Sequence, residues 1–170
     1  LTTLYGIWQN GVGSTSYTIA GGTHVDALGD GINEAFLEDY DSQTGVFSNL
    51  RLYTGFNQPG AITHFENITA VPGGYNLVAT TDSGPAFVNV TRNADGSFGS
   101  GTWVAASLPG TSLMTGNIAY QNVIGGIYNT SSSGASPSTY LGVVDLSHVD
   151  SAGGLIMPAG SFNFAYALTV

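Results

Sequence analysis

The sequence predicts an all-β protein of antiparallel strands arranged in about three similar units. Short runs of β-branched and aromatic residues, bounded by Gly, Pro, Asn and Ser, recur along the chain, and no long stretch has apolar residues at helical spacing. In addition, Pro59-Gly60, Pro109-Gly110 and Pro158-Ala159 follow one another at intervals of 50 and 49 residues. A fixed period of this size is typical of a repeated supersecondary unit that buries its apolar face against its neighbours.

A second pattern runs in the same phase. Ala35-Phe36-Leu37 and Gly45-Val46-Phe47 match Ala86-Phe87-Val88 and Gly96-Ser97-Phe98 at an offset of 51 residues. Thr139-Tyr140-Leu141 starts 53 residues after Ala86 and is a weaker third copy. The two patterns together predict that the units share one strand order.

We expect a single all-β domain over residues 1–170, with units at about 3–59, 60–109 and 110–158. Residues 162–170 follow the third unit and have the composition of the first strand of a fourth. An unpaired strand edge favours aggregation, so this strand has to pair somewhere. It closes the domain, joins a neighbouring molecule, or belongs to a longer array.

Thirteen segments have strand composition, and turn-forming residues separate them. Pro72-Gly73-Gly74 and Asn93-Ala94-Asp95-Gly96 supply the fixed or positive φ that hairpin corners need. In chain order, the predicted strands are Thr3–Gln9, Ser16–Ala20, Ala35–Tyr40, Val46–Leu52, Ile62–Ala70, Tyr75–Thr80, Ala86–Thr91, Ser97–Val104, Asn117–Gln121, Gly125–Tyr128, Thr139–Asp145, Leu155–Met157 and Phe162–Thr169.

Each unit then contains about four strands. Four-stranded units of this length suit propeller blades, but propellers usually have 4–8 blades. Three units therefore predict a closed barrel, a sandwich, or a propeller-like arrangement that dimerisation completes.

The charge composition excludes several classes of partner. The chain has no lysine, its two arginines are Arg51 and Arg92, and its formal net charge is −9. Phosphate binding requires clustered Lys and Arg, so we expect no nucleic-acid partner. No apolar run approaches the roughly 20 residues of a membrane-spanning helix, so we expect no membrane insertion. The chain also has no cysteine, which excludes disulfide and thiolate chemistry.

The order of signals in the second unit resembles a known family. It runs from Ile68–Val71 through the Gly73-Gly74 corner and Tyr75–Val78 to Ala86-Phe87-Val88, Gly96-Ser97-Phe98 and Pro109-Gly110. This order resembles the HAF-type repeats of extracellular bacterial surface proteins, over most of units two and three and part of unit one. Val71-Pro72-Gly73-Gly74 replaces the family's usual Asn-x-x-Gly corner. The resemblance implies an exported structural or binding role without catalytic residues.

Six of the eleven acidic residues fall between Asp26 and Asp41, in an insertion relative to the other units. Oxygen-rich loops suit calcium, and we name Asp26, Asp30 and Glu34 as candidate ligands. The EF-hand pattern itself fails at Leu28, Ile32 and Leu37. A solvated acidic loop and a catalytic carboxylate pair are the alternatives.

The three histidines, His24, His64 and His148, fall at different phases of the units. The repeat therefore does not bring them together, and we expect ordinary surface or loop histidines rather than a zinc site.

Aromatic residues give the best indication of binding. Most aromatics at alternating strand positions belong in a β core, whereas flat aromatics beside Asn and Gln are typical of sugar-binding surfaces. We expect two exposed sets, and the candidate ligand-binding residues are Trp8, Gln9, Asn10, Tyr53, Phe56 and Asn57.

No catalytic motif is present, so the sequence favours an extracellular or cell-surface protein that acts by binding or self-assembly without catalysis. The partner is then another copy of the chain or an extracellular glycan. A secreted glycan-binding module is the first alternative. A secreted hydrolase active in acid, using carboxylates from Asp26–Asp41, is the second.

Overall fold

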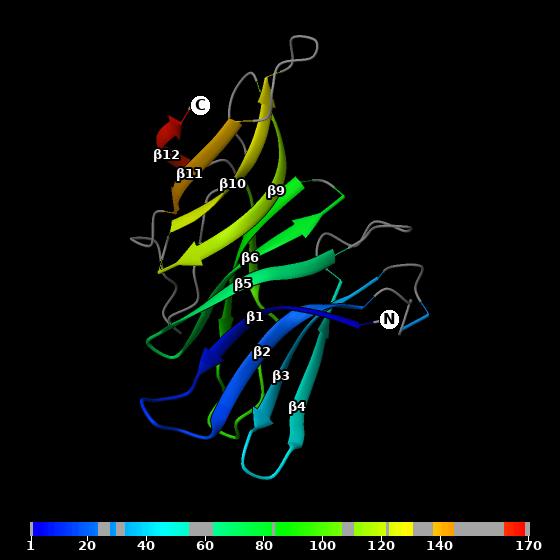
Figure 1. The fold of residues 1–170 in the computed structure, drawn as a ribbon. Coiled ribbons are helices and arrows are strands. Elements are labelled where there is room, and N and C mark those ends of the chain that lie inside the picture. Colours follow the sequence, from blue (N-terminus) through cyan, green and yellow to red (C-terminus); the bar gives the residue numbers. More distant parts are fainter. Residues whose placement is uncertain are drawn as a thin grey trace.

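The computed structural model describes residues 2–23, 28–29, 33–54, 63–82, 84–106, 111–121, 123–130, 138–144 and 162–168. Within these residues it contains twelve strands and no helix. The strands form three four-stranded sheets, and consecutive strands in each sheet pair antiparallel (Figure 1). The predicted all-β antiparallel fold class is therefore confirmed. No described sheet closes into a barrel.

Each sheet takes four strands that are consecutive in the chain. Sheet 1 contains β1 (Thr2–Gln9), β2 (Ser16–Thr23), β3 (Ala35–Asp41) and β4 (Val46–Tyr53). Sheet 2 contains β5 (Thr63–Val71), β6 (Gly74–Thr81), β7 (Gly84–Thr91) and β8 (Thr102–Ala105). Sheet 3 contains β9 (Thr111–Tyr120), β10 (Val123–Thr130), β11 (Ser138–Val144) and β12 (Phe162–Leu168).

The turns form where the sequence predicts them. Pro72-Gly73 joins β5 to β6, and Gly73 has a φ of 79°, which favours glycine. After β7, the Gly96 amide donates to the Asn93 carbonyl at 3.0 Å, and Arg92 forms a bridge with Phe98. The predicted strand Ser97–Val104 is shortened to β8, because Phe98 forms only an isolated bridge with Arg92 and Gly101 has a φ of 81°. The predicted strand Leu155–Met157 lies outside the described residues.

The C-terminal strand belongs to sheet 3. β12 pairs antiparallel with β11, with Leu168 opposite Thr139 and Phe162 opposite Val144. Our interpretation of residues 162–170 as the first strand of a fourth unit is therefore wrong. Sheet 3 needs β12 as its fourth strand, because β9, β10 and β11 supply only three. Accordingly, the predicted boundary at Pro158 falls between two strands of one sheet.

A β-bulge in the first strand of each sheet gives a common reference point. The bulge residues that we compare are Tyr5 in β1, Glu66 in β5 and Asn117 in β9, and each lies between two paired neighbours. β9 has a second irregularity between Leu113 and Thr115, and Gly116 and Ile118 lie on the same faces whichever of the two is used. Alternate residues of a strand point to opposite faces. We call the face with the residue before the bulge (Leu4, Phe65 or Gly116) the trailing face. The face with the residue after the bulge (Gly6, Asn67 or Ile118) is the leading face.

The sheets pack in sequence order, leading face on trailing face. Ala20 and Leu37 on the leading face of sheet 1 lie in one core cluster with Phe65, Ile68 and Leu77 on the trailing face of sheet 2. A Cβ on Gly6 would lie 3.1 Å from Ile68 Cγ2, so the two sheets are in close contact at this point. The apolar core therefore lies mainly between sheets 1 and 2.

The second contact follows the same rule. Gly116, on the trailing face of sheet 3, lies so close to Val78 on the leading face of sheet 2 that a Cβ would overlap the valine side chain. Asn76 Nδ2 on the same face donates to the Gln121 carbonyl at 2.6 Å. Ala86, Phe87 and Val88 of β7 are consequently all fully buried, as expected for a sheet that is covered on both faces.

Contact between the sheets concentrates near their first strands. β5 contacts β1, β2 and β3, while β9 contacts β5, β6 and β7. The later strands spread outward from these first strands, as Figure 1 shows for β2–β4 below and β10–β12 above. The order of packing and the spread of the strands together make a row of three sheets. Apolar residues are exposed on the outer face of each end sheet, although Ile19 and Phe36 on the middle strands of sheet 1 are buried.

Candidate functional site

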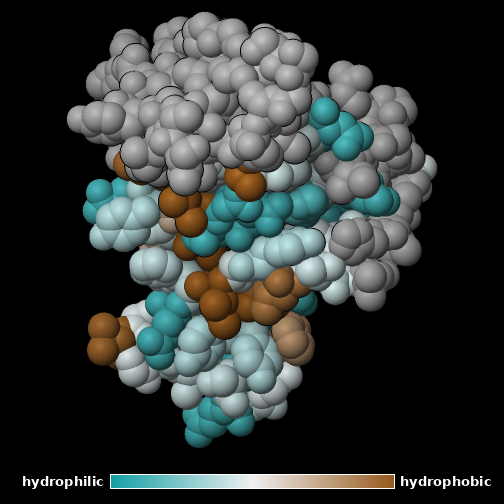
Figure 2. All heavy atoms as spheres, turned by 45° about the horizontal axis from the view of Figure 1, so that its top comes forward, coloured by the Kyte–Doolittle hydropathy of each residue, from teal (hydrophilic) through white to brown (hydrophobic). Residues whose placement is uncertain are grey.

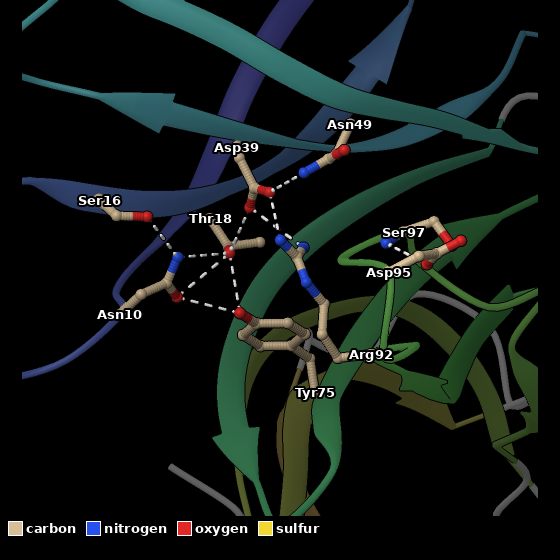
Figure 3. A network of polar contacts seen from close by, with 9 residues as sticks. All are labelled: Asn10, Ser16, Thr18, Asp39, Asn49, Tyr75, Arg92, Asp95 and Ser97. Atoms are coloured by element: carbon tan, nitrogen blue, oxygen red, sulfur yellow. Dashed lines mark hydrogen bonds and ion pairs between the residues drawn. The ribbon is translucent and has the colours of Figure 1, made fainter.

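A network of polar side chains joins sheet 1 to sheet 2 (Figure 3). Its centre is the buried Asp39 carboxylate of β3. Arg92, at the end of β7, donates from Nη1 to Asp39 Oδ1 at 3.1 Å, and its Nη2 forms an ion pair with Asp39 Oδ2. Asn49 Nδ2 donates to Oδ2 at 2.7 Å, and Thr18 Oγ1 donates to Oδ1 at 3.0 Å. The carboxylate therefore has partners from both sheets.

Asn10 and Tyr75 extend this network toward the surface. Tyr75 Oη donates to Asn10 Oδ1 at 2.9 Å, and the hydroxyls of Tyr75 and Thr18 are also 2.9 Å apart. Asn10 Nδ2 donates to Ser16 Oγ at 3.1 Å. The buried polar atoms are thus hydrogen-bonded to one another, as stable polar networks require.

Both arginines of the chain hold sheet 1 and sheet 2 together. The Arg92 guanidinium lies 4.2 Å from the centre of the Phe98 ring, in addition to its ion pair with Asp39. Arg51 of β4 donates to the Phe98 carbonyl at 2.7 Å. The network is therefore chiefly a structural connection between the two sheets.

Two hollows flank Trp8 beside this network. One has a volume of about 360 Å³, and its lining includes Trp8, Asn10, Tyr75 and Arg92. The other has a volume of about 430 Å³ and is lined by Ile7, Trp8, Gln9, Gly11 and Val12. The predicted set Trp8, Gln9 and Asn10 thus lines surface hollows, with Trp8 partly buried and Gln9 exposed.

The second predicted aromatic set is not exposed in the way we expected. Tyr53 is only 5% exposed, and its ring packs edge-on against Phe65 at a centroid distance of 5.2 Å. Its hydroxyl donates to the Gly99 carbonyl at 3.0 Å, and burial raises the pKa of the phenol. The expectation that Tyr53 is a surface residue is therefore wrong, because its ring completes the core between sheets 1 and 2. Phe56 and Asn57 lie outside the described residues.

The candidate calcium ligands are described only in part. Asp26 and Asp30 lie outside the described residues. Glu34 is fully buried, and its carboxylate accepts hydrogen bonds from the Leu28 amide and Thr23 Oγ1, each at 2.8 Å. No group of three or more His, Asp or Glu residues that could hold a metal ion occurs within the described ranges. Calcium binding stays a prediction.

The described carboxylates of the acidic segment do not form a catalytic pair. Glu38 and Asp39 are adjacent in β3 and point to opposite faces of sheet 1. Burial, and then the charge of Asp39, raise the pKa of Glu38. Asp41 accepts hydrogen bonds from the amides of Thr44 and Gln43, which lower its pKa. These side chains have separate local roles, so nothing here favours the hydrolase alternative.

Sequence reasoning missed one pair of titratable side chains. His64 Nε2 and Glu66 Oε1 of β5 are 2.6 Å apart, and the His64 ring stacks on Tyr5 of β1 at 5.2 Å. His64 Nδ1 is buried without a hydrogen-bond partner. The only sequence signal for this pair is that His64 and Glu66 are two positions apart. This signal can be interpreted only once the bulges at Tyr5 and Glu66 are known.

Comparison with known proteins identifies no relative: no family model, curated protein or solved structure matches this chain. The resemblance to HAF-type repeats therefore stays an expectation. The described residues contain no helix that is long and apolar enough to cross a membrane.

Proposed function

We propose that this protein is an extracellular or cell-surface subunit that acts by binding and self-assembly, not by catalysis, and that its three sheets are arranged like propeller blades. The observation that carries the proposal is an asymmetry of burial. Sheet 2 is covered on both faces, whereas large apolar side chains on the outer faces of sheets 1 and 3 reach solvent. Exposed apolar patches of this kind are typical of protein interaction sites.

The open face of sheet 1 is the better defined of the two. Leu4, Ile7 and Phe47 lie on its trailing face, and each is more than half exposed. Glu34 and Glu38 are the charged residues among the described residues of this face, and since Glu34 is fully buried, only Glu38 brings charge to its surface. A surface that is apolar and depleted of charge resembles the centre of a protein–protein interface. Figure 2 shows hydrophobic residues reaching the surface between hydrophilic ones.

The test is the mass of the protein in solution over a range of concentrations, measured by light scattering. We expect association that the double substitution Ile7→Ser and Phe47→Ser weakens at least tenfold. Leu28→Ser is the control, because Leu28 is 57% exposed and lies between β2 and β3, outside the strands. A wild-type protein that stays monomeric at high concentration would refute self-assembly.

A glycan-binding module is the second candidate, and the two hollows beside Trp8 favour it. An aromatic ring next to amide side chains offers apolar stacking and hydrogen bonding to a sugar. Asn10 is engaged in the network, so Gln9 is the better polar candidate. A glycan array tests this idea with Gln9→Ala and Trp8→Phe, and Tyr120→Phe serves as a control at an exposed aromatic elsewhere. Equal binding by all these proteins, or no binding by the wild type, would exclude the site.

A further inference from the structure

The bulges allow residues of the three sheets to be compared, and this comparison shows which exposed residues correspond to buried ones. Ile7 and Ile68 each lie two positions after a bulge residue, on the trailing face of their sheet. Ile68 is 4% exposed because sheet 1 covers it, whereas Ile7 is 58% exposed. Leu4 and Phe65 form a second equivalent pair, exposed in sheet 1 and fully buried in sheet 2. The exposed positions Leu4 and Ile7, on the edge strand β1, are therefore equivalent to positions of sheet 2 that sheet 1 buries. On the middle strands of the same face, Ile19 and Phe36 are already buried.

The same comparison applies at the other end of the row. Ile118 and Tyr120 lie on the leading face of sheet 3, and Tyr120 is 66% exposed. The same face of sheet 2 carries Asn67 and Thr69, and Thr69 is buried on the side toward sheet 3. In sheet 1 this face carries Gly6 and Trp8, which face sheet 2. The row therefore ends in exposed apolar residues on one trailing face and on one leading face.

We propose that these two faces bind each other between two copies of the chain, head to tail. This inference rests on the self-assembly proposed above and specifies its geometry. Sheet 3 of each copy docks its leading face on the trailing face of sheet 1 of the other copy. Two such contacts close a ring of six sheets, in which every sheet is covered on both faces. The contact repeats the rule by which sheet 1 already meets sheet 2, and sheet 2 meets sheet 3.

The number of copies follows from the size of closed propellers. Propellers usually contain 4–8 blades. Each chain supplies three sheets, so only two copies give a number of sheets within this range. Because the contact is heterologous, it forms a closed ring if the rotation between sheets closes and an open filament if it does not.

The contact area is sufficient for a stable dimer. A face of four strands about 4.8 Å apart, each about eight residues long at 3.3 Å per residue, covers roughly 500 Å². The ring has two contacts of two faces each, so it buries at most roughly 2,000 Å² in total, the upper end of the standard range for stable interfaces. Ile19 and Phe36 are already buried in one chain, so the newly buried area is smaller than this bound.

The comparison of the sheets also identifies residues that meet between the two copies. Gly6 lies against Ile68 where sheet 1 contacts sheet 2. Between two copies, the corresponding contact brings Ile7 on the trailing face of one chain to the leading face of the other, where Ile118 is exposed. Isologous docking of two sheet 1 faces would instead bring Ile7 near its own copy, so the two arrangements differ in a measurable way.

The experiment is complementation between two variants. The trailing-face variant carries Ile7→Ser and Phe47→Ser, and the leading-face variant carries Ile118→Ser and Tyr120→Ser. We expect each variant alone to be monomeric at concentrations where the wild type has the mass of two chains. An equimolar mixture has one intact pair of faces, so it recovers a mass of two chains.

Other outcomes overturn the proposal in distinguishable ways. If the leading-face variant dimerises like the wild type, head-to-tail docking is wrong while self-assembly stands. If the two variants complement each other but the wild type has a mass above that of two chains, the closed ring of six sheets is excluded. A monomeric wild type would remove self-assembly itself and with it this inference.

Cross-linking gives a second readout that does not depend on weakening the fold. The chain has no cysteine, so Ile7→Cys and Ile118→Cys can be made as two separate proteins. A short bismaleimide should link the two proteins when they are mixed and should link neither protein to itself. Linkage of the Ile7→Cys protein alone would instead indicate isologous docking.

Discussion

The Arg92 guanidinium binds both carboxylate oxygens of Asp39, 53 residues earlier in the chain. Asp39 belongs to sheet 1 and Arg92 to the end of a strand in sheet 2, so this pair fixes the two sheets against each other. The carboxylate is about one-tenth exposed and the guanidinium about one-quarter. An ion pair that is this well covered and hydrogen-bonded is costly to break from one side.

We expect Asp39→Asn to lower the free energy of unfolding by about 2–4 kcal/mol, because Arg92 would keep its charge without a partner. Chemical denaturation measures this loss. Asp82→Asn removes the same charge from an exposed residue and should change stability by less than about 0.5 kcal/mol. Adding Arg92→Met to Asp39→Asn should cost less than the sum of the single changes; additive losses would show that the two residues are not coupled.

Tyr53→Phe removes one hydroxyl from the core between sheets 1 and 2. The lost hydrogen bond leaves the Gly99 carbonyl without this donor, so the free energy of unfolding should fall by about 1 kcal/mol. Tyr120→Phe, at an exposed tyrosine, is the control and should have no measurable effect. Equal stability of the Tyr53→Phe protein and the wild type would mean that this hydrogen bond contributes nothing.

Glu38→Gln should stabilise the protein at neutral pH. The pKa of Glu38 is raised in the folded state, so ionisation of this group opposes folding. Its contribution to stability is full below the ordinary pKa of 4.5 and is lost as the pH rises through the folded value. Thermal unfolding should therefore show a higher midpoint for the variant at pH 7 and no difference well below pH 4.

Asp95→Asn is the control of opposite sign for this pH dependence. Hydrogen bonds from the Ser97 side chain and amide lower the pKa of Asp95, so its contribution is present at neutral pH and is lost as the pH falls through the folded value. The variant should be less stable than the wild type at pH 7. If both substitutions shift the midpoint in the same direction, local environment does not determine these pKa values.

Glu34→Gln separates a structural role from a metal-binding one. The buried carboxylate accepts from the Leu28 amide and the Thr23 hydroxyl, so the substitution should cost about 1–3 kcal/mol in the absence of any metal. Calcium should raise the unfolding midpoint of the wild type, but not that of the variant, only if Asp26, Asp30 and Glu34 form a site. A midpoint that calcium does not change in either protein would exclude it.

Most of the strands could be predicted from the sequence because each is a local pattern. Runs such as Tyr75–Thr80 and Ala86–Thr91 combine strand-forming residues with turn formers at both ends, and they appear as β6 and β7. The sequence predicts the C-terminal strand but not the sheet that it joins, because strand composition does not specify the partner strand. The Pro158-Ala159 punctuation suggested a boundary that the pairing of β12 with β11 does not respect.

The candidate site was less predictable, since its residues come together only through packing. Trp8 and Tyr53 have the same aromatic signal in the sequence, yet Trp8 lines a hollow and Tyr53 lies in the core. No local pattern links Asp39 to Arg92 across the sheet contact. The correspondence between the three sheets could not be predicted either, because the bulge residues share no residue type. They are Tyr5, Glu66 and Asn117.

The position of the two arginines has a consequence for how this protein meets other molecules. Arg51 and Arg92 are the only lysine or arginine side chains of the chain, and both are engaged between sheets 1 and 2. Two copies therefore approach each other as like-charged bodies, because each carries a net charge of −9 and only Arg51 presents an exposed guanidinium. Their encounter should be slow in dilute buffer and faster as added salt shortens the range of the repulsion.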